Sequence, residues 1–310
     1  MQEHFGFEAV LYAVSITGMI SNAWPVERST WSIFCISPMI ENSQYMHNPF
    51  GIICTVLALS NFGVMLVFFG WNALPMNILQ IYAESPGKVV GQIALFCLYS
   101  CEYAHVALSF NRLVHIAFPL QGWRFFTKPV TVVIVLLILL FAFLEVIPYF
   151  SPEQCYFVFD PTTALWNFAD TECGRFCAQY IDFLISVIVL STILVMDAIA
   201  LFLFHQHRLN LACDSDKNRS IEKKLFAQSI CQMVPICIAI FANHFIGGNQ
   251  SSDWGLFLSV TLSWGMLHAV DGLVLVALHS KLLEETISML TKVWTRQFNK
   301  LQPSNSLNIE

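Results

Sequence analysis

Charged residues are scarce in this sequence. Only 12% of its 310 residues are Asp, Glu, Lys or Arg, whereas 56% are hydrophobic. Soluble domains usually carry about 25% charged residues, so this composition argues against an ordinary soluble protein and indicates an integral membrane protein. The sequence also lacks a long basic run, which excludes nucleic acid as an expected partner.

Catalytic motifs are missing as well. The sequence contains no G-x-S-x-G, no H-E-x-x-H and no glycine-rich loop that could hold a phosphate. We therefore expect neither an enzyme nor a bound cofactor. The first seven residues, MQEHFGF, contain no Lys or Arg, so we expect no cleavable signal peptide.

Long apolar runs dominate what is present. A helix that spans a membrane needs about 20 mostly apolar residues. Seven segments approximately meet this requirement: 8–26, 49–71, 89–118, 129–150, 178–205, 226–246 and 254–279. Residues 281–300 predict an amphipathic helix that lies on membrane lipid, because apolar and basic residues fall on separate faces. Residues 1–300 should form one domain, followed by a disordered tail, 301–310.

The positions of Lys and Arg predict the orientation of these helices. Cytoplasmic loops of membrane proteins carry an excess of both residues. With the N-terminus outside, only Lys88 and Arg175 lie outside and the other thirteen lie on the cytoplasmic side. This uneven distribution of Lys and Arg holds only if the chain crosses the membrane an odd number of times. The predicted fold is therefore an all-α membrane protein, a bundle of seven transmembrane helices with the N-terminus out and the C-terminus in.

Three of the ten cysteines lie in or beside the long outer loop, 151–177, where oxidation is expected. A bridge between Cys155 and Cys173 is the first choice, and a bridge between Cys155 and Cys177 is the rival. Three free thiols remain a third alternative. In the last outer loop, Asn249 begins an acceptor sequence for N-glycosylation.

The stretch SFNRLVHIAFP, residues 109–119, places an arginine near the inner end of the third predicted helix. A buried guanidinium is costly without a partner, so Arg112 should either reach lipid phosphates at the membrane edge or have a function. Pro119 follows Arg112 by seven residues, and this spacing resembles the DRY region of rhodopsin-like receptors. The resemblance implies that Arg112 contacts a G protein. Asn111 replaces the acid of that motif, so we expect a weakly restrained arginine.

Further motifs stand in the corresponding order. LALSN (57–61) resembles the second-helix motif with Asn61 in place of aspartate, Pro235 stands where a sixth-helix kink belongs, and HAVDGLVL (268–275) occupies the place of the seventh-helix motif. With NPFGIICTVLALSN, LSFNRLVHIAFPL and the Cys155…Trp166…Cys173 loop, the chain resembles the nematode serpentine receptor class x family over roughly residues 8–300. The resemblance implies a rhodopsin-like chemosensory G-protein-coupled receptor in the plasma membrane, including that of sensory cilia. Its partners would be a small-molecule ligand, a heterotrimeric G protein and membrane lipid.

The resemblance also suggests site residues. Ala94 stands where aminergic receptors carry an aspartate, so we expect an apolar, aromatic cavity and an uncharged ligand. The expected lining is Ala94, Leu98, Tyr99, Phe241, His244, Phe245 and Trp264. The expected G-protein coupling residues are Asn111, Arg112, Lys223 and Lys224. Because Asn61 removes a carboxylate, we expect no metal.

Several polar residues fall within the predicted helices. Glu102, His105, Ser109 and Arg112 share one face of the third helix, either as a relay to Arg112 or as a local network that fixes helix packing. Glu145 and Asp197 each stand alone in a helix, and we expect structural partners for both. Two other functions remain open: a transporter or channel subunit, and a receptor-like chain that does not signal.

Overall fold

The computed structural model describes residues 49–72, 85–118, 121–151, 154–160, 163, 165–210, 216–250 and 252–278. The first predicted span, 8–26, the predicted tail helix, 281–300, and the tail, 301–310, lie outside the described residues. Within the described part, six helical segments are long and apolar enough to cross a membrane. They overlap the six spans predicted from residue 49 onward.

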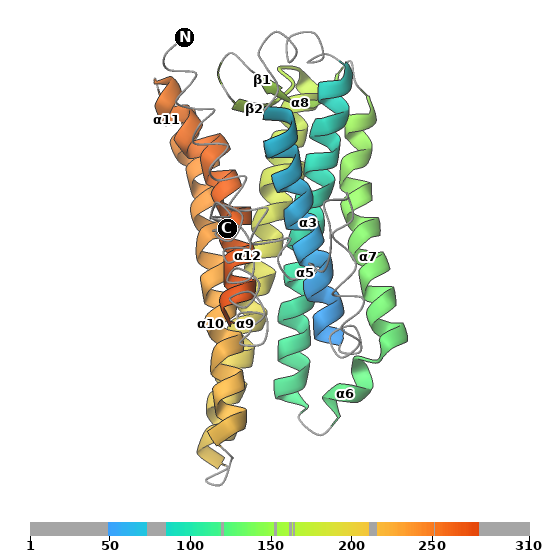
Figure 1. Cartoon of the computed structure of the whole chain (residues 1–310), viewed down its shortest axis with the longest axis vertical. Helices are drawn as coiled ribbons and strands as arrows, with labels where there is room; N and C mark the ends of the chain where they lie inside the picture. Colours follow the sequence, from blue (N-terminus) through green and yellow to red (C-terminus); the bar gives the residue numbers. More distant parts are fainter. Residues whose placement is uncertain are drawn as a thin grey trace, which may run out of the picture.

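Each long segment consists of one helix or of several joined end to end (Figure 1). Two are single helices, α3 (Pro49–Asn72) and α5 (Ser85–Ala117). The short α6 (Gly122–Phe125) precedes α7 (Lys128–Val146), which continues as a 3₁₀ turn, η2 (Ile147–Phe150). The remaining segments contain π-helical turns: α8 (Glu172–Phe176), η3 (Cys177–Leu184) and α9 (Ile185–Asn210); α10 (Asp216–Phe241), η4 (Ala242–Ile246) and η5 (Gly247–Asn249); α11 (Asp253–Phe257), η6 (Leu258–Leu262) and α12 (Ser263–Leu278).

The amino-acid pattern of α7 shows why these segments suit a bilayer. The most apolar window of Lys128–Phe150 has a mean hydropathy of 3.2, and only 28% of that window is buried inside the protein. Leu136, Leu140 and Phe143 are all more than 40% exposed. Since a helix satisfies its own backbone hydrogen bonds, apolar side chains of this kind can face lipid directly.

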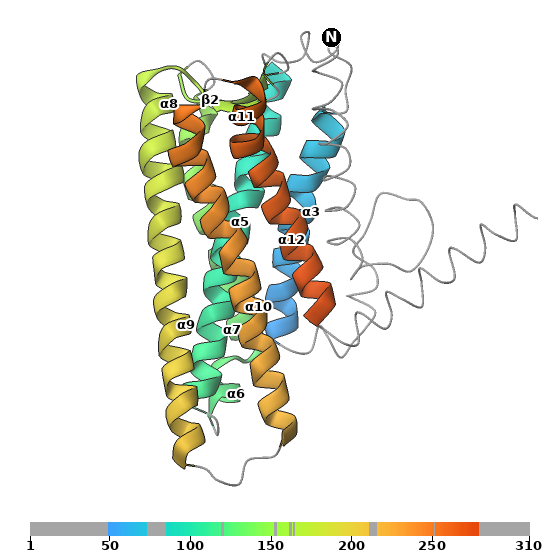
Figure 2. The ribbon, with the colours of Figure 1, turned by 90° about the vertical axis from the view of Figure 1, so that its left-hand side faces the viewer.

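Helix α5 occupies the centre of the bundle. It packs against α3, α7 and α9, while α12 packs against both α3 and α10. Figures 1 and 2 show the long helices running side by side, with α5 enclosed by its neighbours. Residues on the inward faces of α5 are therefore able to contact most of the other helices.

A β-hairpin, which the sequence analysis did not predict, covers one end of the bundle. Strands β1 (Phe157–Asp160) and β2 (Leu165–Phe168) pair antiparallel with Phe157 opposite Phe168. We call this the hairpin end, and the opposite end, where α6 lies, the α6 end (Figure 1). Gly91 allows the hairpin to reach α5, because a Cβ at this position would lie 1.9 Å from the Phe157 carbonyl oxygen. The ammonium of Lys88 lies 4.2 Å from the centre of the Tyr156 ring and adds a cation–π contact.

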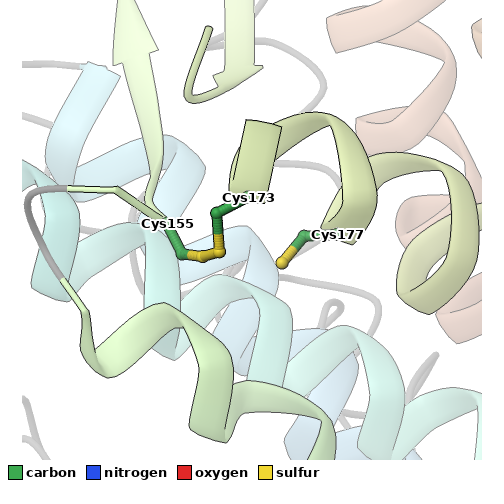
Figure 3. A group of neighbouring side chains, drawn as sticks. All are labelled: Cys155, Cys173 and Cys177. Atoms are coloured by element: carbon green, nitrogen blue, oxygen red, sulfur yellow. A yellow bond between two sulfur atoms is a disulfide. The ribbon is translucent and has the colours of Figure 1, made fainter. Parts of the chain in front are cut away.

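A disulfide joins the hairpin to the next helix. Cys155, just before β1, is bonded to Cys173 on α8, which confirms the first-choice bridge (Figure 3). Cys177 is a buried free thiol, and the three Sγ atoms lie within 4.8 Å of one another. The closeness of Cys177 explains why the sequence alone could not separate the two pairings.

Candidate functional site

A cavity of about 330 Å³ extends from beneath the hairpin into the helix bundle. Its volume falls at the small end of the range for small-molecule sites. Every long helical segment described except α7 contributes to its wall. The lining residues that enter the argument below are Asn61, Leu98, Glu102, His105, Asp182, Ser186, Ile236, Ile240, His244, Trp264, His268 and Asp271, together with Phe157 and Trp166 of the hairpin.

Aromatic rings close the cavity at the hairpin end. The rings of Phe157 and Trp166 stack with centroids 5.4 Å apart. Trp264, at the start of α12, packs edge-on against both, with centroid distances of 5.5 Å to Phe157 and 6.1 Å to Trp166. The indole N–H groups of both tryptophans have no hydrogen-bond acceptor among the described residues. These rings therefore supply apolar surface and two free donors.

Two carboxylates line the middle of the cavity. Glu102 on α5 accepts a hydrogen bond of 2.7 Å from the hydroxyl of Ser186 on α9. Asp182, one turn before Ser186, has an Oδ2 atom 3.6 Å from the imidazole Nε2 of His244. That separation is longer than a hydrogen bond. The cavity is thus not purely apolar, and the sequence-based expectation that it lacks an acid is wrong, because it considered only the upper turns of α5.

The floor of the cavity is a hydrogen-bonded network around Asp271 of α12. Asn61 on α3 donates to Asp271 Oδ2 at 2.6 Å, and the Nε2 of His105 on α5 lies 3.1 Å from the same oxygen. Gln232 on α10 donates to Asp271 Oδ1 at 2.5 Å. His268 Nδ1 lies 2.6 Å from Asn61 Oδ1. Four helices meet at this one carboxylate, which is buried and fully engaged by its neighbours.

Below the network, towards the α6 end, lies Arg112. Its Nη2 is 3.2 Å from Oδ1 and 3.3 Å from Oδ2 of Asp197 on α9, and 3.0 Å from the hydroxyl of Ser229 on α10. Ser109 donates to Asp197 at 2.5 Å, and Ser229 also donates to Asp197. Arg112 is only 6% exposed. It therefore does not reach lipid phosphates, and the membrane-edge interpretation does not fit.

The acid that restrains Arg112 is Asp197 on α9, and not the residue that precedes Arg112 on α5. Asn111 is buried, and its amide nitrogen has no partner among the described residues. Asp197 provides a carboxylate in its place, so the expectation of a weakly restrained arginine is wrong. Glu145 also has a partner, since Tyr103 donates a hydrogen bond to it.

The predicted lining residues fall into three groups. Leu98, His244 and Trp264 line the cavity. Ala94 and Tyr99 are buried in the core but are not part of the lining, and Tyr99 contacts the hydroxyl of Tyr149 instead. Phe241 and Phe245 are 56% and 53% exposed and stack on each other at the outer surface of α10 and η4.

The other predicted site residues are less fully described. Lys223 and Lys224 belong to α10, near its start at the α6 end. Asn249 ends η5 and is exposed, as a glycosylation site requires. The sequence analysis missed Asp182 and assigned no role to Trp166. A single acid inside an apolar run and the alternation in FVFD and LWNF were the available signals.

Comparison with known proteins adds to this geometry. The profile of the family described as "Serpentine type 7TM GPCR chemoreceptor Srx" matches residues 13–279. The chain belongs to this Srx family. It is also 20% identical to "Serpentine receptor class X 45" of Caenorhabditis elegans over 256 residues, which cover 76% of this chain and 71% of that protein.

Membership settles the broad class of the protein. An Srx chain is a serpentine seven-helix membrane protein, and the family is one of chemoreceptors rather than enzymes. The profile begins within the first predicted span, 8–26, and ends with the last. The six long helices described here are therefore part of a multi-pass serpentine bundle.

Proposed function

We propose that this Srx chain is a chemosensory receptor that binds a small external molecule in the cavity and activates a heterotrimeric G protein at the α6 end. In this proposal the hairpin end faces outward and the C-terminus lies in the cytoplasm. The charge bias supports this orientation: Lys88 and Arg175 lie near the hairpin, whereas Arg112, Arg124 and Lys128 lie towards α6. The plasma membrane, including that of a sensory cilium, is the expected location.

The contact of Arg112 with Asp197 and Ser229 is the observation that carries the proposal. It ties α5 to α9 and α10 with a buried charge. Outward movement of α10 would remove Ser229 and leave Arg112 with only part of its restraint. The Nε and Nη1 atoms of Arg112 have no acceptor within the described residues, so the guanidinium retains donors for a carbonyl or carboxylate of the G protein. Lys223 and Lys224, by their position on α10, would contribute to the same surface.

Helix α10 provides the physical connection between the cavity and Arg112. Ile236 lines the cavity, Gln232 donates to Asp271, and Ser229 contacts Arg112. These residues are spaced by three and four positions, which places them on one face of the helix. Pro235 lies inside α10, where it removes one backbone hydrogen bond and permits a bend. A ligand that displaces this face would therefore act on both networks at once.

Nucleotide exchange measures this function directly. The full-length chain, reconstituted in lipid nanodiscs with a heterotrimeric G protein, should accelerate nucleotide exchange above the rate of the G protein alone. Arg112→Ala should abolish the acceleration when it is compared with the unaltered chain at equal concentration of folded receptor. The control is Arg175→Ala, which removes an exposed arginine of α8 at the hairpin end, away from the proposed G-protein surface. Solute flux without nucleotide exchange would favour a transporter. Ligand binding without nucleotide exchange would favour a receptor-like chain that does not signal.

A further inference from the structure

The cavity has a chemical character that the family membership does not specify. We propose that it binds a small organic cation, a primary amine or quaternary ammonium, between the carboxylates of Glu102 and Asp182 and the aromatic rings beneath the hairpin. This inference rests on the proposed function, because it takes the cavity as the ligand site.

The charges around the cavity are unbalanced. Among the described residues that line it, three are acidic, Glu102, Asp182 and Asp271, and none is Lys or Arg. Asp271 is satisfied by the imidazole of His105 and by two amide donors. Glu102 accepts from the neutral hydroxyl of Ser186, and Asp182 accepts from the neutral hydroxyl of Tyr99. The imidazole of His244 stays 3.6 Å from Asp182. A carboxylate accepts several hydrogen bonds, so both retain lone pairs for a cationic donor.

The two carboxylates are close enough to act on one ligand. Asp182 and Ser186 are four residues apart on one helical segment, and both line the cavity. Neighbours of this spacing lie about 5–6 Å apart at Cβ. Because the hydroxyl of Ser186 donates to Glu102, the Glu102 carboxylate of α5 lies beside the residue that follows Asp182 by one turn. Carboxylates inside a membrane are costly without a partner and usually mark a functional site.

The aromatic end of the cavity indicates an organic cation rather than a metal ion. The rings of Phe157, Trp166 and Trp264 surround one end of a space of about 330 Å³, which is much larger than a single ion. Tryptophan faces attract ammonium groups through the ring quadrupole. Trp166 is only 3% exposed, yet its N–H has no acceptor among the described residues. A buried donor of this kind calls for an acceptor, such as a hydroxyl or carbonyl oxygen, on the ligand.

The test compares cations with uncharged molecules of the same shape. The melting temperature of the purified full-length chain in nanodiscs is measured with each of four compounds in turn. The first pair is the cation phenylethylammonium and the uncharged phenylethanol. The second pair is the cation choline and its uncharged carbon analogue dimethylbutanol. A compound at free concentration c that binds the folded state stabilises it by RT ln(1 + c/Kd), so its affinity is obtained from the rise in melting temperature over a series of concentrations. At least one cation should bind about tenfold or more tightly than its uncharged counterpart, because loss of a buried charge pair has an effect of at least that size.

Variants then locate the cation. Glu102→Gln and Asp182→Asn keep the shape of each side chain and remove its charge, and each should weaken the preferred cation about tenfold or more while leaving the uncharged counterpart unaffected. The matched control is Glu172→Gln, which removes an exposed carboxylate at the hairpin end outside the cavity lining. This control should bind the cation like the unaltered chain.

Three results would overturn the inference. The first is that the uncharged compound binds as tightly as its cation, or more tightly, in both pairs. The second is that neither cation stabilises the chain at concentrations up to about 10 mM. The third is that Glu102→Gln and Asp182→Asn both bind the cation as tightly as the unaltered chain does. The comparison of the pairs uses the unaltered chain, so it decides the question even where a variant fails to fold. Because the assay contains no G protein, its result is independent of whether the chain signals.

Discussion

Arg112 on α5 and Asp197 on α9 form an ion pair 85 residues apart in the sequence, with Nη2 3.2 Å from Oδ1 and side chains only 5% and 14% exposed. The pair is shared with Ser109 and Ser229, so three helices meet at it. Removing one partner of a buried pair leaves an uncompensated charge, which costs about 3–5 kcal/mol. Because separating the pair would leave each charge buried without its partner, the contact ties α5, α9 and α10 together in this arrangement.

The first prediction concerns the residue before the arginine. Asn111→Asp introduces an acid where rhodopsin-like receptors carry one, but Asp197 already neutralises Arg112. We therefore expect ligand-independent nucleotide exchange to change less than twofold. A strong decrease would mean that Asp197 restrains Arg112 less than the structure indicates.

The second prediction concerns the Asn61–Asp271 contact. Asn61→Asp would place two carboxylates within 2.6 Å, and Asp271→Asn would remove the acceptor charge opposite His105. Each single change should lower the thermal stability of the purified receptor. The double exchange, Asn61→Asp with Asp271→Asn, restores one amide and one carboxylate and should recover part of the loss. A double variant as unstable as the sum of the singles would argue that the contact is not formed.

The third prediction concerns the hairpin. Gly91→Ala places a Cβ against the Phe157 carbonyl and should displace β1 from α5, with a loss of about 1–3 kcal/mol. Melting temperature and surface level should both fall. Val89→Ala, at an exposed position on the same helix, is the control and should have little effect. Equal behaviour of the two variants would show that the hairpin does not rest on Gly91.

The fourth prediction concerns the disulfide. Cys155→Ser removes the bridge and should lower stability by about 2–4 kcal/mol, and adding Cys173→Ser should cost little more. Cys173→Ser alone should be milder, because Cys177 lies close enough to pair with Cys155 instead. Cys177→Ser should have a small effect. A large loss in Cys177→Ser, with Cys173→Ser tolerated, would favour the rival bridge.

The helices could be predicted from the sequence because they depend on local signals, whereas the disulfide could be narrowed only to a first choice and a rival among three loop cysteines. Long apolar runs locate the spans, and the spacing from Arg112 to Pro119 singles out the arginine. The partner of Arg112 could not be predicted, because it depends on how α5 and α9 are rotated against each other. No periodic pattern within either helix records that rotation.

The cavity lining was harder to predict for a related reason. In a soluble helix, polar residues mark the outer face, whereas a helix in lipid is apolar on all sides. The sequence therefore could not show that Phe241 and Phe245 face outward while Ile236 and Ile240 face the cavity. The two-stranded hairpin was missed because each strand has only four residues, too few for a strong alternating signal.

Ligand-independent nucleotide exchange by Asp197→Asn tests the central claim most directly. The substitution keeps the side-chain volume and removes the charge that restrains Arg112, so the active state should become more populated. Loss of a charge-assisted hydrogen bond is worth about 1.5–3 kcal/mol, which predicts an increase in exchange of about tenfold or more where the active state is a small minority. Adding Arg112→Ala should return exchange to the rate of the G protein alone, at equal receptor concentration. Exchange that is unchanged in Asp197→Asn, or that persists in the double variant, would contradict the proposal that this ion pair controls coupling.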